Sequence, residues 1–313
     1  MANMHEPLLR FHDKYVKLDA GKKARLRDLR DTNLKRIERG MNRMAGQMKD
    51  EVPRPVKVWN QGSYAMNTLI LSPVDDYDID VALVFDAEVL PKRAWEARQQ
   101  VAAAILEIGG NFSTQPRRRT NAVTVWYADG FHLDFAIYRR RAPGPDSVTL
   151  IEHAGARWTP SDPRAMLDWF RNEVRRRSPK PKQGARVRAR QLQRIVRLLK
   201  CYAHSRPSWD SPGGLLLTVL VVHCYRADNY RDDRALHNTM RAMEGHLKMT
   251  IDIPSPIDPA VLLTQKKKYR KQVARFSDRL SVTLQHMRPL RDHRCSNSRA
   301  VTAWKQVFNH ELR

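Results

Sequence analysis

The spacing of hydrophobic residues predicts helices toward both ends of the 313-residue chain. From about Met4 to Lys49, apolar residues recur at intervals of three and four in a polar sequence, which is typical of a long helical segment. An alanine-rich stretch from Trp95 to Ile108 is followed by Gly109-Gly110 and predicts a further helix. In the C-terminal part of the chain, helical spacing occurs in residues 192–203, 215–225 and 267–287.

The region between these helices alternates apolar and polar residues with a period of two, as strands do. The clearest strand runs from Asp78 to Phe85, where the odd-numbered residues form an apolar face and Asp78 and Asp80 share the opposite face. Residues 128–130 predict a hairpin turn between two of the other strands. Shorter strands are expected at 56–59, 123–127 and 132–138, and 68–72 fits either a helix end or an extended segment.

These elements predict an α+β protein of mixed α/β character. Residues 177–190 break both periodicities and contain Pro179, Pro181 and Gly184, which is typical of a linker. The expected organisation is a helical spine, a mixed α/β catalytic core, a basic linker and a helical C-terminal lobe, at 1–50, 51–176, 177–190 and 191–313.

The formal net charge of +24 favours polyanionic partners such as nucleoside triphosphates, nucleic acid or anionic surfaces. Much of the excess lies in residues 171–206, which hold thirteen Lys or Arg and a single acid, Glu173. Two interpretations of this segment are open: a solvated linker and helix face, or one wall of a phosphate-binding cleft.

Other features exclude several classes of protein. The longest apolar run, 213–224, is about half of the ~20 residues that a membrane-spanning helix needs. Three cysteines far apart, Cys201, Cys224 and Cys295, argue against a disulfide framework or a zinc ribbon. The N-terminus lacks the pattern of a secretory signal. We therefore expect a soluble enzyme of the reducing cytoplasm, without a membrane partner.

Three acidic residues on predicted strands carry the chemistry: Asp78, Asp80 and Asp134. Side chains at positions i and i+2 of a strand leave the same face, with Cα atoms about 7 Å apart. With a third carboxylate from a neighbouring strand, they can hold two magnesium ions, one activating a hydroxyl and one neutralising a leaving pyrophosphate. The alternative is that the paired aspartates merely face water on an edge strand, and Asp134 together with a nearby glycine-serine turn argues against it.

A second register is also considered, because Asp76 and Asp78 are likewise two residues apart. Pro73 places Asp75 and Asp76 in the preceding turn, so we prefer Asp78 and Asp80. His132 shares a face with Asp134 and is either a metal ligand or, as we prefer, a supporting or packing residue.

A glycine-serine turn, Gln61-Gly62-Ser63-Tyr64, lies fifteen residues before Asp78 when counted from the serine. Such a turn brings backbone N–H groups and a hydroxyl close to a triphosphate. We expect Ser63 to donate to a β- or γ-phosphate, Gln61 to fix the loop or touch the nucleotide, and Tyr64 to pack or stack. Lys200, on the polar edge of a C-terminal helix, is a candidate phosphate clamp. Together with the aspartates, the turn predicts a nucleotidyltransferase site.

In the order of these motifs the chain resembles the CD-NTases, bacterial cyclic-oligonucleotide synthases related to animal cyclic GMP-AMP synthase. The resemblance spans roughly Trp59 to Leu263 and is strongest to the DncV-like branch. Three further stretches carry it: Glu152 to Gly155 with Trp158 to Pro163 and Trp169-Phe170, Arg197 to Tyr202, and Pro212 to Leu220. It implies a bilobed, polymerase-β-like nucleotidyltransferase fold.

The resemblance also implies an activity and its partners. A CD-NTase joins nucleoside triphosphates, ATP and GTP being favoured here, into a ring that activates a separate effector in antiphage defence (CBASS). It implies that Ser63 and Lys200 contact the donor triphosphate and that the three aspartates bind two Mg²⁺ ions, which Mn²⁺ can replace. Where relatives often have serine, this chain has Gly213, and Ser211 is the candidate for that hydroxyl. Where relatives often have arginine before the third aspartate, Thr124 stands.

Two other functions remain open from the sequence. A linear nucleotidyltransferase acting on RNA, a protein or a small molecule would use the same aspartates, with the basic segment 171–206 as an RNA track. A catalytically silent nucleic-acid sensor is the third, and the three retained acids count against it. Regulation by a protein or nucleic acid fits the basic surface in each case.

Overall fold

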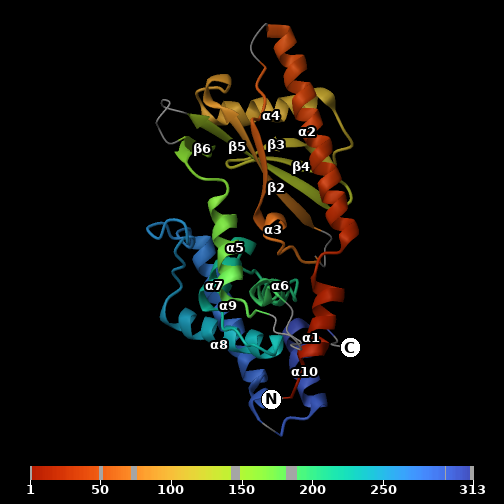
Figure 1. Ribbon diagram of the computed structural model, residues 1–313, viewed down its shortest axis with the longest axis vertical. Coiled ribbons are helices and arrows are strands. Elements are labelled where there is room, and N and C mark those ends of the chain that lie inside the picture. The colour runs from red at the N-terminus through yellow and green to blue at the C-terminus, as the bar shows by residue number, and fades with distance from the viewer. Residues whose placement is uncertain are drawn as a thin grey trace. The chain divides into compact units, whose positions relative to one another are not determined.

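The computed structural model describes residues 2–48, 52–71, 76–141, 149–180, 189–292 and 294–310. The chain forms two compact units, each assembled from separated segments (Figure 1). The sheet unit comprises Leu18–Met66 and Ser72–Leu167. The helical unit comprises Met1–Lys17, Asn67–Leu71 and Asp168–Arg313. The boundaries expected from the sequence stay a prediction, and the units cut across them because the chain passes between the units several times.

The sheet unit is built on a mixed sheet of seven strands within the described residues. The strands are β1 (Lys57–Gln61), β2 (Tyr77–Asp86), β3 (Thr114–Arg118), β4 (Val123–Trp126), β5 (Phe131–Arg141), β6 (Leu150–Ala154) and β7 (Trp158–Pro160). Their order is β1-β2-β5-β4-β3, with β6 pairing with β5 and β7. β2 and β5 are parallel, and the other pairs are antiparallel. The mixed α/β prediction is confirmed.

Two helices of the sheet unit, α2 (Ala20–Met48) and α4 (Ala94–Ile108), pack against each other and against the sheet (Figure 1). Gly40 allows their close approach, because a Cβ there would lie 1.9 Å from the carbonyl oxygen of Ala104. α4 ends at Gly109, whose φ of +74° suits the left-handed cap that the sequence predicted.

The predicted N-terminal helical segment is helical but not continuous. It begins as α1 (His5–Phe11), continues in a π-helical turn (His12–Val16), and is followed after a break by α2. The first two pieces belong to the helical unit, whereas α2 belongs to the sheet unit. Periodicity could not show this division, because both sides of the break bury apolar residues at helical spacing.

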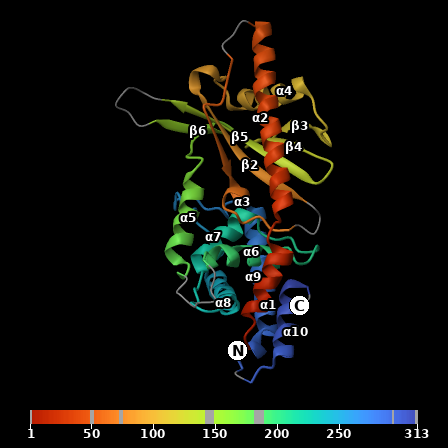
Figure 2. The same cartoon turned by 45° about the vertical axis from the view of Figure 1, so that its right-hand side comes forward.

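The helical unit contains the C-terminal helices and part of α5 (Figure 2). These helices are α5 (Ala165–Arg177), α6 (Gln191–Ala203), α7 (Gly214–Cys224), α8 (Asp232–Met249), α9 (Lys267–His286) and α10 (Asn297–Phe308), with a short 3₁₀ helix at Arg288–Arg291. The core holds fully buried aromatic rings from α6, α9 and α10: Tyr202, Phe276 and Trp304. The three predicted C-terminal helices are confirmed in α6, α7 and α9.

The sequence patterns did not predict β3, β6, β7, α5, α8 and α10. β3 is polar and largely exposed, so it lacks the apolar alternation that marks a half-buried strand. Residues 68–71 are mainly irregular, with a single bridge from Ile70 to Lys17. Part of the predicted linker, 181–188, lies outside the described residues. In the described part of the chain, no helix is long and apolar enough to cross a membrane.

Candidate active site

The three predicted aspartates belong to the two parallel strands at the centre of the sheet. Asp80 is the register partner of Asp134, and Asp78 is the partner of His132. Register partners in a sheet share a face, and neighbouring strands are about 4.8 Å apart. The opposite face carries the fully buried side chains of Ile79, Val81, Leu83, Phe85, Leu133 and Phe135. The predicted alternation along β2 is confirmed. Together with the register of β5, it puts all three carboxylates, each half-buried, on one side of the sheet.

The glycine-serine turn lies against Asp80. Gly62 opens the short helix α3 (Gly62–Ala65) with a φ of +59°, a left-handed conformation that favours glycine. A Cβ built at Gly62 would stand only 1.7 Å from Oδ2 of Asp80. Two independent constraints therefore require glycine here, the backbone conformation and the carboxylate that occupies the space of a side chain.

Thr124 supports the third aspartate. It is the register partner of Asp134 on β4, and its hydroxyl donates a hydrogen bond to Asp134 Oδ1. The sequence interpretation considered Thr124 only as a departure from relatives and missed this contact. The signal was available, because Thr124 and Asp134 are equidistant from Asp129 in the predicted hairpin turn.

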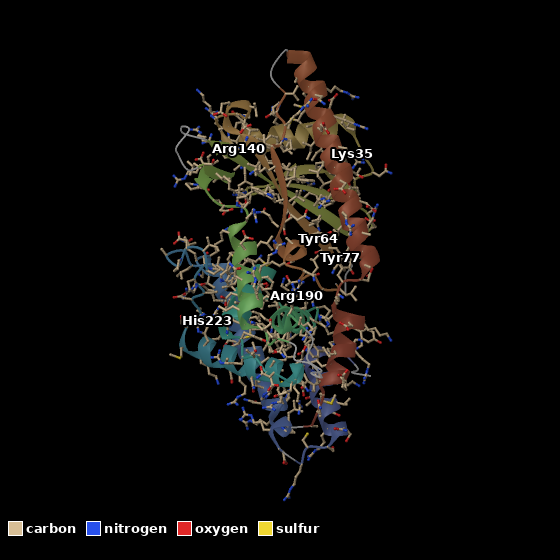
Figure 3. All side chains as sticks on the ribbon, in the orientation of Figure 1. Lys35, Tyr64, Tyr77, Arg140, Arg190 and His223 are labelled. Atoms are coloured by element: carbon tan, nitrogen blue, oxygen red, sulfur yellow. The ribbon has the colours of Figure 1, made fainter. Side chains whose placement is uncertain are left out.

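Gln61 anchors the turn. Its side-chain amide donates to the carbonyl oxygen of Pro163 at 2.6 Å and to the Tyr138 hydroxyl at 3.3 Å. Burial raises the pKa of Tyr138, so that hydroxyl stays protonated. Of the two roles expected for Gln61, the contacts match fixing the loop. Tyr64 lies half-buried on α3 (Figure 3).

Asp76 precedes β2 and has an exposed carboxylate, in contrast to Asp78 and Asp80 within the strand. Oδ1 of Asp76 is 3.1 Å from Nδ1 of the half-buried His132. Asp75, the other acid of the alternative register, lies outside the described residues. The assignment of the metal-binding pair to Asp78 and Asp80 stays a prediction, and the position of Asp76 before the strand is consistent with it.

Two predicted triphosphate contacts, Lys200 and Ser211, belong to the helical unit. Lys200 is only 5% exposed, so the expectation that it lies on a polar helix edge is wrong; α6 is buried around this position. Its amine lies 3.2 Å from Oγ1 and 3.5 Å from the carbonyl oxygen of Thr68. The Ser211 hydroxyl donates to the carbonyl oxygen of Ala203 at 2.5 Å. Their roles toward a triphosphate remain predictions.

The basic segment 171–206 is not uniformly a solvated face. Arg194 and Arg197 are each 5% exposed, whereas Arg176 is exposed and pairs with Glu173. Arg194 forms a buried ion pair with Asp232 at 2.6 Å. Some of the cations of this segment therefore belong to the interior of the helical unit.

The donor set fits magnesium in its chemistry. Carboxylate oxygens are the ligands that Mg²⁺ prefers, and two neighbouring like charges such as Asp80 and Asp134 gain from a divalent cation. Among the described residues, no group of three or more His, Cys, Asp or Glu side chains is already arranged as a metal centre.

A mixed sheet with two acids on one central strand, a third on its parallel neighbour and a glycine turn against them defines a nucleotidyltransferase fold. Comparison with known proteins agrees. Residues 56–138 match the family described as "Cyclic GMP-AMP synthase DncV-like, nucleotidyltransferase domain". In this part of the sequence the chain is similar to the nucleotidyltransferase domain of DncV-like CD-NTases, and its fold is similar to theirs.

Relatives of known sequence or structure resemble the chain at low identity. A cyclic GMP-AMP synthase of Escherichia albertii is 25% identical over 230 residues, which are 70% of this chain and 48% of that protein. The match thus spans about half the length of that relative. Vibrio cholerae DncV with a linear intermediate has a TM-score of 0.75 at 13% identity, covering 100% of this chain and 98% of that one. Bradyrhizobium diazoefficiens CdnG with GTP has a TM-score of 0.66 at 19% identity, covering 91% of each chain. These structures share the fold.

Proposed function

We propose that this protein is a cyclic di- or oligonucleotide synthase that joins nucleoside triphosphates with release of pyrophosphate. The observation that carries the proposal is the register pairing of Asp80 with Asp134, with the Gly62 turn packed against Asp80. This arrangement brings an acidic pair next to a turn suited to phosphate. Both parts are needed for nucleotide transfer, and neither is needed for a stable sheet.

Each residue of the site then has a chemical role. Two magnesium ions bound by Asp78, Asp80 and Asp134 would lower the pKa of an attacking hydroxyl and neutralise the leaving pyrophosphate. Ser63 donates its hydroxyl to the donor triphosphate, and Gly62 lets the backbone approach it. Thr124 orients the Asp134 carboxylate through its hydrogen bond. Gln61 holds the turn through Pro163.

The substrates and the biological role extend the proposal. DncV has been solved with ATP and GTP and with a linear pppApG intermediate, and CdnG with GTP. We infer that this chain uses ATP, GTP or both, and that its product is a second messenger that activates a separate effector in cytoplasmic antiphage defence.

One incubation tests the activity. The full chain is supplied with Mg²⁺ or Mn²⁺ and each pair of labelled triphosphates, and the products are treated with phosphatase and nuclease. We expect a phosphatase-resistant product that disappears with EDTA and in Asp78→Ala or Asp80→Ala protein. Asp76→Ala is the matched control and is expected to keep most of the turnover, because Asp76 precedes the strand.

Two outcomes would replace the proposal. Labelling that requires added RNA or another acceptor would indicate a linear nucleotidyltransferase. No turnover with any nucleotide pair, combined with tight nucleic-acid binding, would indicate a silent sensor.

A third outcome concerns only the choice of metal-binding aspartates. Loss of turnover in Asp76→Ala but not in Asp80→Ala would show that the assignment to Asp78 and Asp80 is wrong.

A further inference from the structure

A buried arginine of α6 connects two other segments of the helical unit. Arg197 is 5% exposed, and its Nε donates to Nε2 of His12 at 2.9 Å. Its guanidinium also donates to the carbonyl oxygen of Asn67. One side chain thus joins α6, the π-helical turn and the segment Asn67–Leu71.

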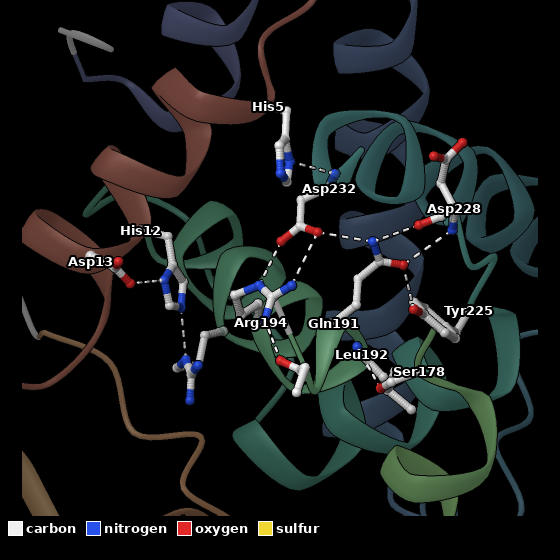
Figure 4. A network of polar contacts seen from close by, with 12 residues as sticks. His5, His12, Asp13, Ser178, Gln191, Leu192, Arg194, Tyr225, Asp228 and Asp232 are labelled. Atoms are coloured by element: carbon white, nitrogen blue, oxygen red, sulfur yellow. Dashed lines mark hydrogen bonds and ion pairs between the residues drawn. The ribbon is translucent and has the colours of Figure 1, made fainter. Parts of the chain in front are cut away.

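His12 is held in the form that accepts this hydrogen bond. Its Nδ1 is 2.8 Å from Oδ1 of Asp13 (Figure 4), and His12 as a whole is 1% exposed. Arginine can only donate, so Nε2 of His12 must carry a lone pair and Nδ1 must carry the proton that points to Asp13. Burial, the Arg197 charge and more weakly the Arg194 charge lower the pKa of His12 to about 4, against the opposing effect of Asp13. The ring is therefore neutral near pH 7.

Asn67 is the first residue of the helical unit after the glycine-serine turn. It lies four residues after Ser63 and directly follows Met66, whose N–H closes the α3 turn by donating to the Gly62 carbonyl. Asn67 has a φ of +53°, a left-handed conformation that Asn tolerates better than most residues. The Arg197 bond to its carbonyl fixes the orientation of this peptide.

A second side chain of α6 holds the next residue. Thr68 is fully buried and contacts the Lys200 amine through both its hydroxyl and its carbonyl oxygen. Arg197 and Lys200 are three residues apart on α6, so they lie on one helix face. That face thus holds two consecutive residues of the chain that leaves the turn.

Stability alone is a weak explanation for Arg197. Arg194, one turn earlier, pairs with the buried carboxylate of Asp232. Arg197 forms no ion pair with a carboxylate of the described residues, and burial lowers its pKa to about 10. A buried cation held by a neutral ring and a carbonyl is costly to keep, which favours a role for its position.

We propose that Arg197 is a positioning residue for the triphosphate loop: oriented by His12 and Asp13, it fixes Asn67 and thereby the exit of the Gly62-Ser63 turn. The assignment rests on the proposed function, because the loop is taken to bind the donor triphosphate. Arg197 acts through the backbone and does not touch the substrate.

The test compares Arg197→Met with Arg197→Lys and with Arg206→Met in the full chain. Arg206 is a matched control, because its guanidinium also donates to backbone carbonyls, those of Gln306 and Val307, after the end of the same helix. Three quantities are measured for each folded protein: amide hydrogen exchange of residues 62–71, and KM and kcat for the triphosphates.

We expect faster exchange in residues 62–71 for Arg197→Met only. We also expect a KM increase of roughly tenfold or more, since a hydrogen bond from a charged group is lost, with partial recovery in Arg197→Lys. A His12→Gln protein, whose amide oxygen can still accept from Arg197, should keep most of the protection, whereas His12→Phe should lose it. Thermal unfolding of every variant separates these effects from a general loss of folding.

The outcomes separate the two proposals. Unchanged exchange in 62–71 with unchanged KM in Arg197→Met overturns the positioning role. An equal effect of Arg206→Met also overturns it, because the cause would then be general destabilisation. If the wild-type protein makes no product, the proposed function fails, and exchange alone decides whether Arg197 fixes the turn.

Discussion

The carboxylate of Asp80 occupies the place that the Cβ of any other residue would take at Gly62. Oδ2 of Asp80 would be 1.7 Å from such a Cβ, far inside van der Waals contact. The glycine of the glycine-serine turn and one proposed metal ligand are therefore packed directly against each other. A change in either should displace the other.

The first prediction concerns this contact. Gly62→Ala should lower turnover by about a hundredfold or more, because the new methyl group must displace Asp80 and the left-handed φ of +59° strains alanine. Turnover of labelled triphosphates measures it. Gly245→Ala in α8 is the control: nothing lies within 4 Å of its Cβ position, so activity should be unchanged. Equal activity of Gly62→Ala and wild type would refute the packed arrangement.

The second prediction concerns Thr124. Thr124→Val keeps the shape but removes the hydroxyl that donates to Asp134. We expect the apparent Mg²⁺ affinity to fall by about tenfold to a hundredfold, as for other partners of metal ligands. The Mg²⁺ dependence of turnover measures it, and Thr124→Ser should behave like the wild type. If the Mg²⁺ concentration that gives half-maximal turnover is the same in Thr124→Val as in the wild type, then the hydrogen bond from Thr124 does not orient Asp134 for metal binding.

The third prediction concerns pH. The pKa of His12 is about 4 in the folded protein and 6.5 when unperturbed, so between these values the unfolded chain binds more protons. The contribution of His12 is complete above pH 6.5 and decreases as pH falls toward 4. The loss from pH 7 to pH 5 should be about 2 kcal/mol.

Urea denaturation at both pH values measures this loss. His12→Gln has no titrating ring. Between pH 7 and pH 5, its free energy of unfolding should therefore decrease by about 2 kcal/mol less than that of the wild type. If the free energy of unfolding depends on pH in the same way for both proteins, His12 is not buried in the neutral form.

The fourth prediction concerns the Arg194–Asp232 pair, which is central to the network in Figure 4. Asp232→Ala leaves a buried guanidinium without its carboxylate and should lower the free energy of unfolding by about 3–5 kcal/mol. Glu244→Gln breaks a partly exposed pair with Lys248 and should change it by less than about 1 kcal/mol. Urea denaturation of both variants gives the comparison, and similar values for the two would contradict the burial of the first pair.

The strand that carries the paired acids was predictable, because alternation along β2 is a local property of the sequence. The same holds for the hairpin after β4, since Gly130 supplies the positive φ of the turn. Strands without alternation, such as β3 and β6, were not predictable. Their hydrogen bonds are made with partners that local periodicity does not reveal.

The roles of basic residues divided in the same way. Lys200 was identified by its place in a motif, but its burial and its contact with Thr68 depend on how α6 packs. Arg197 stood in a stretch that carries the resemblance, but nothing in the sequence pattern connected it with His12, because their partnership joins residues 185 positions apart.

The sequence by itself was enough to predict the type of chemistry, since Gly62, Ser63 and three aspartates at strand-like spacing are a local pattern. It also determined most of the helices and the central strands. Only the tertiary structure decided which residues meet: Asp80 with Asp134 across a parallel pair, Thr124 with Asp134, and Arg197 with Asn67. The physical reason is that register and side-chain packing arise from contacts between distant segments, whereas periodicity records only which face of each segment is buried.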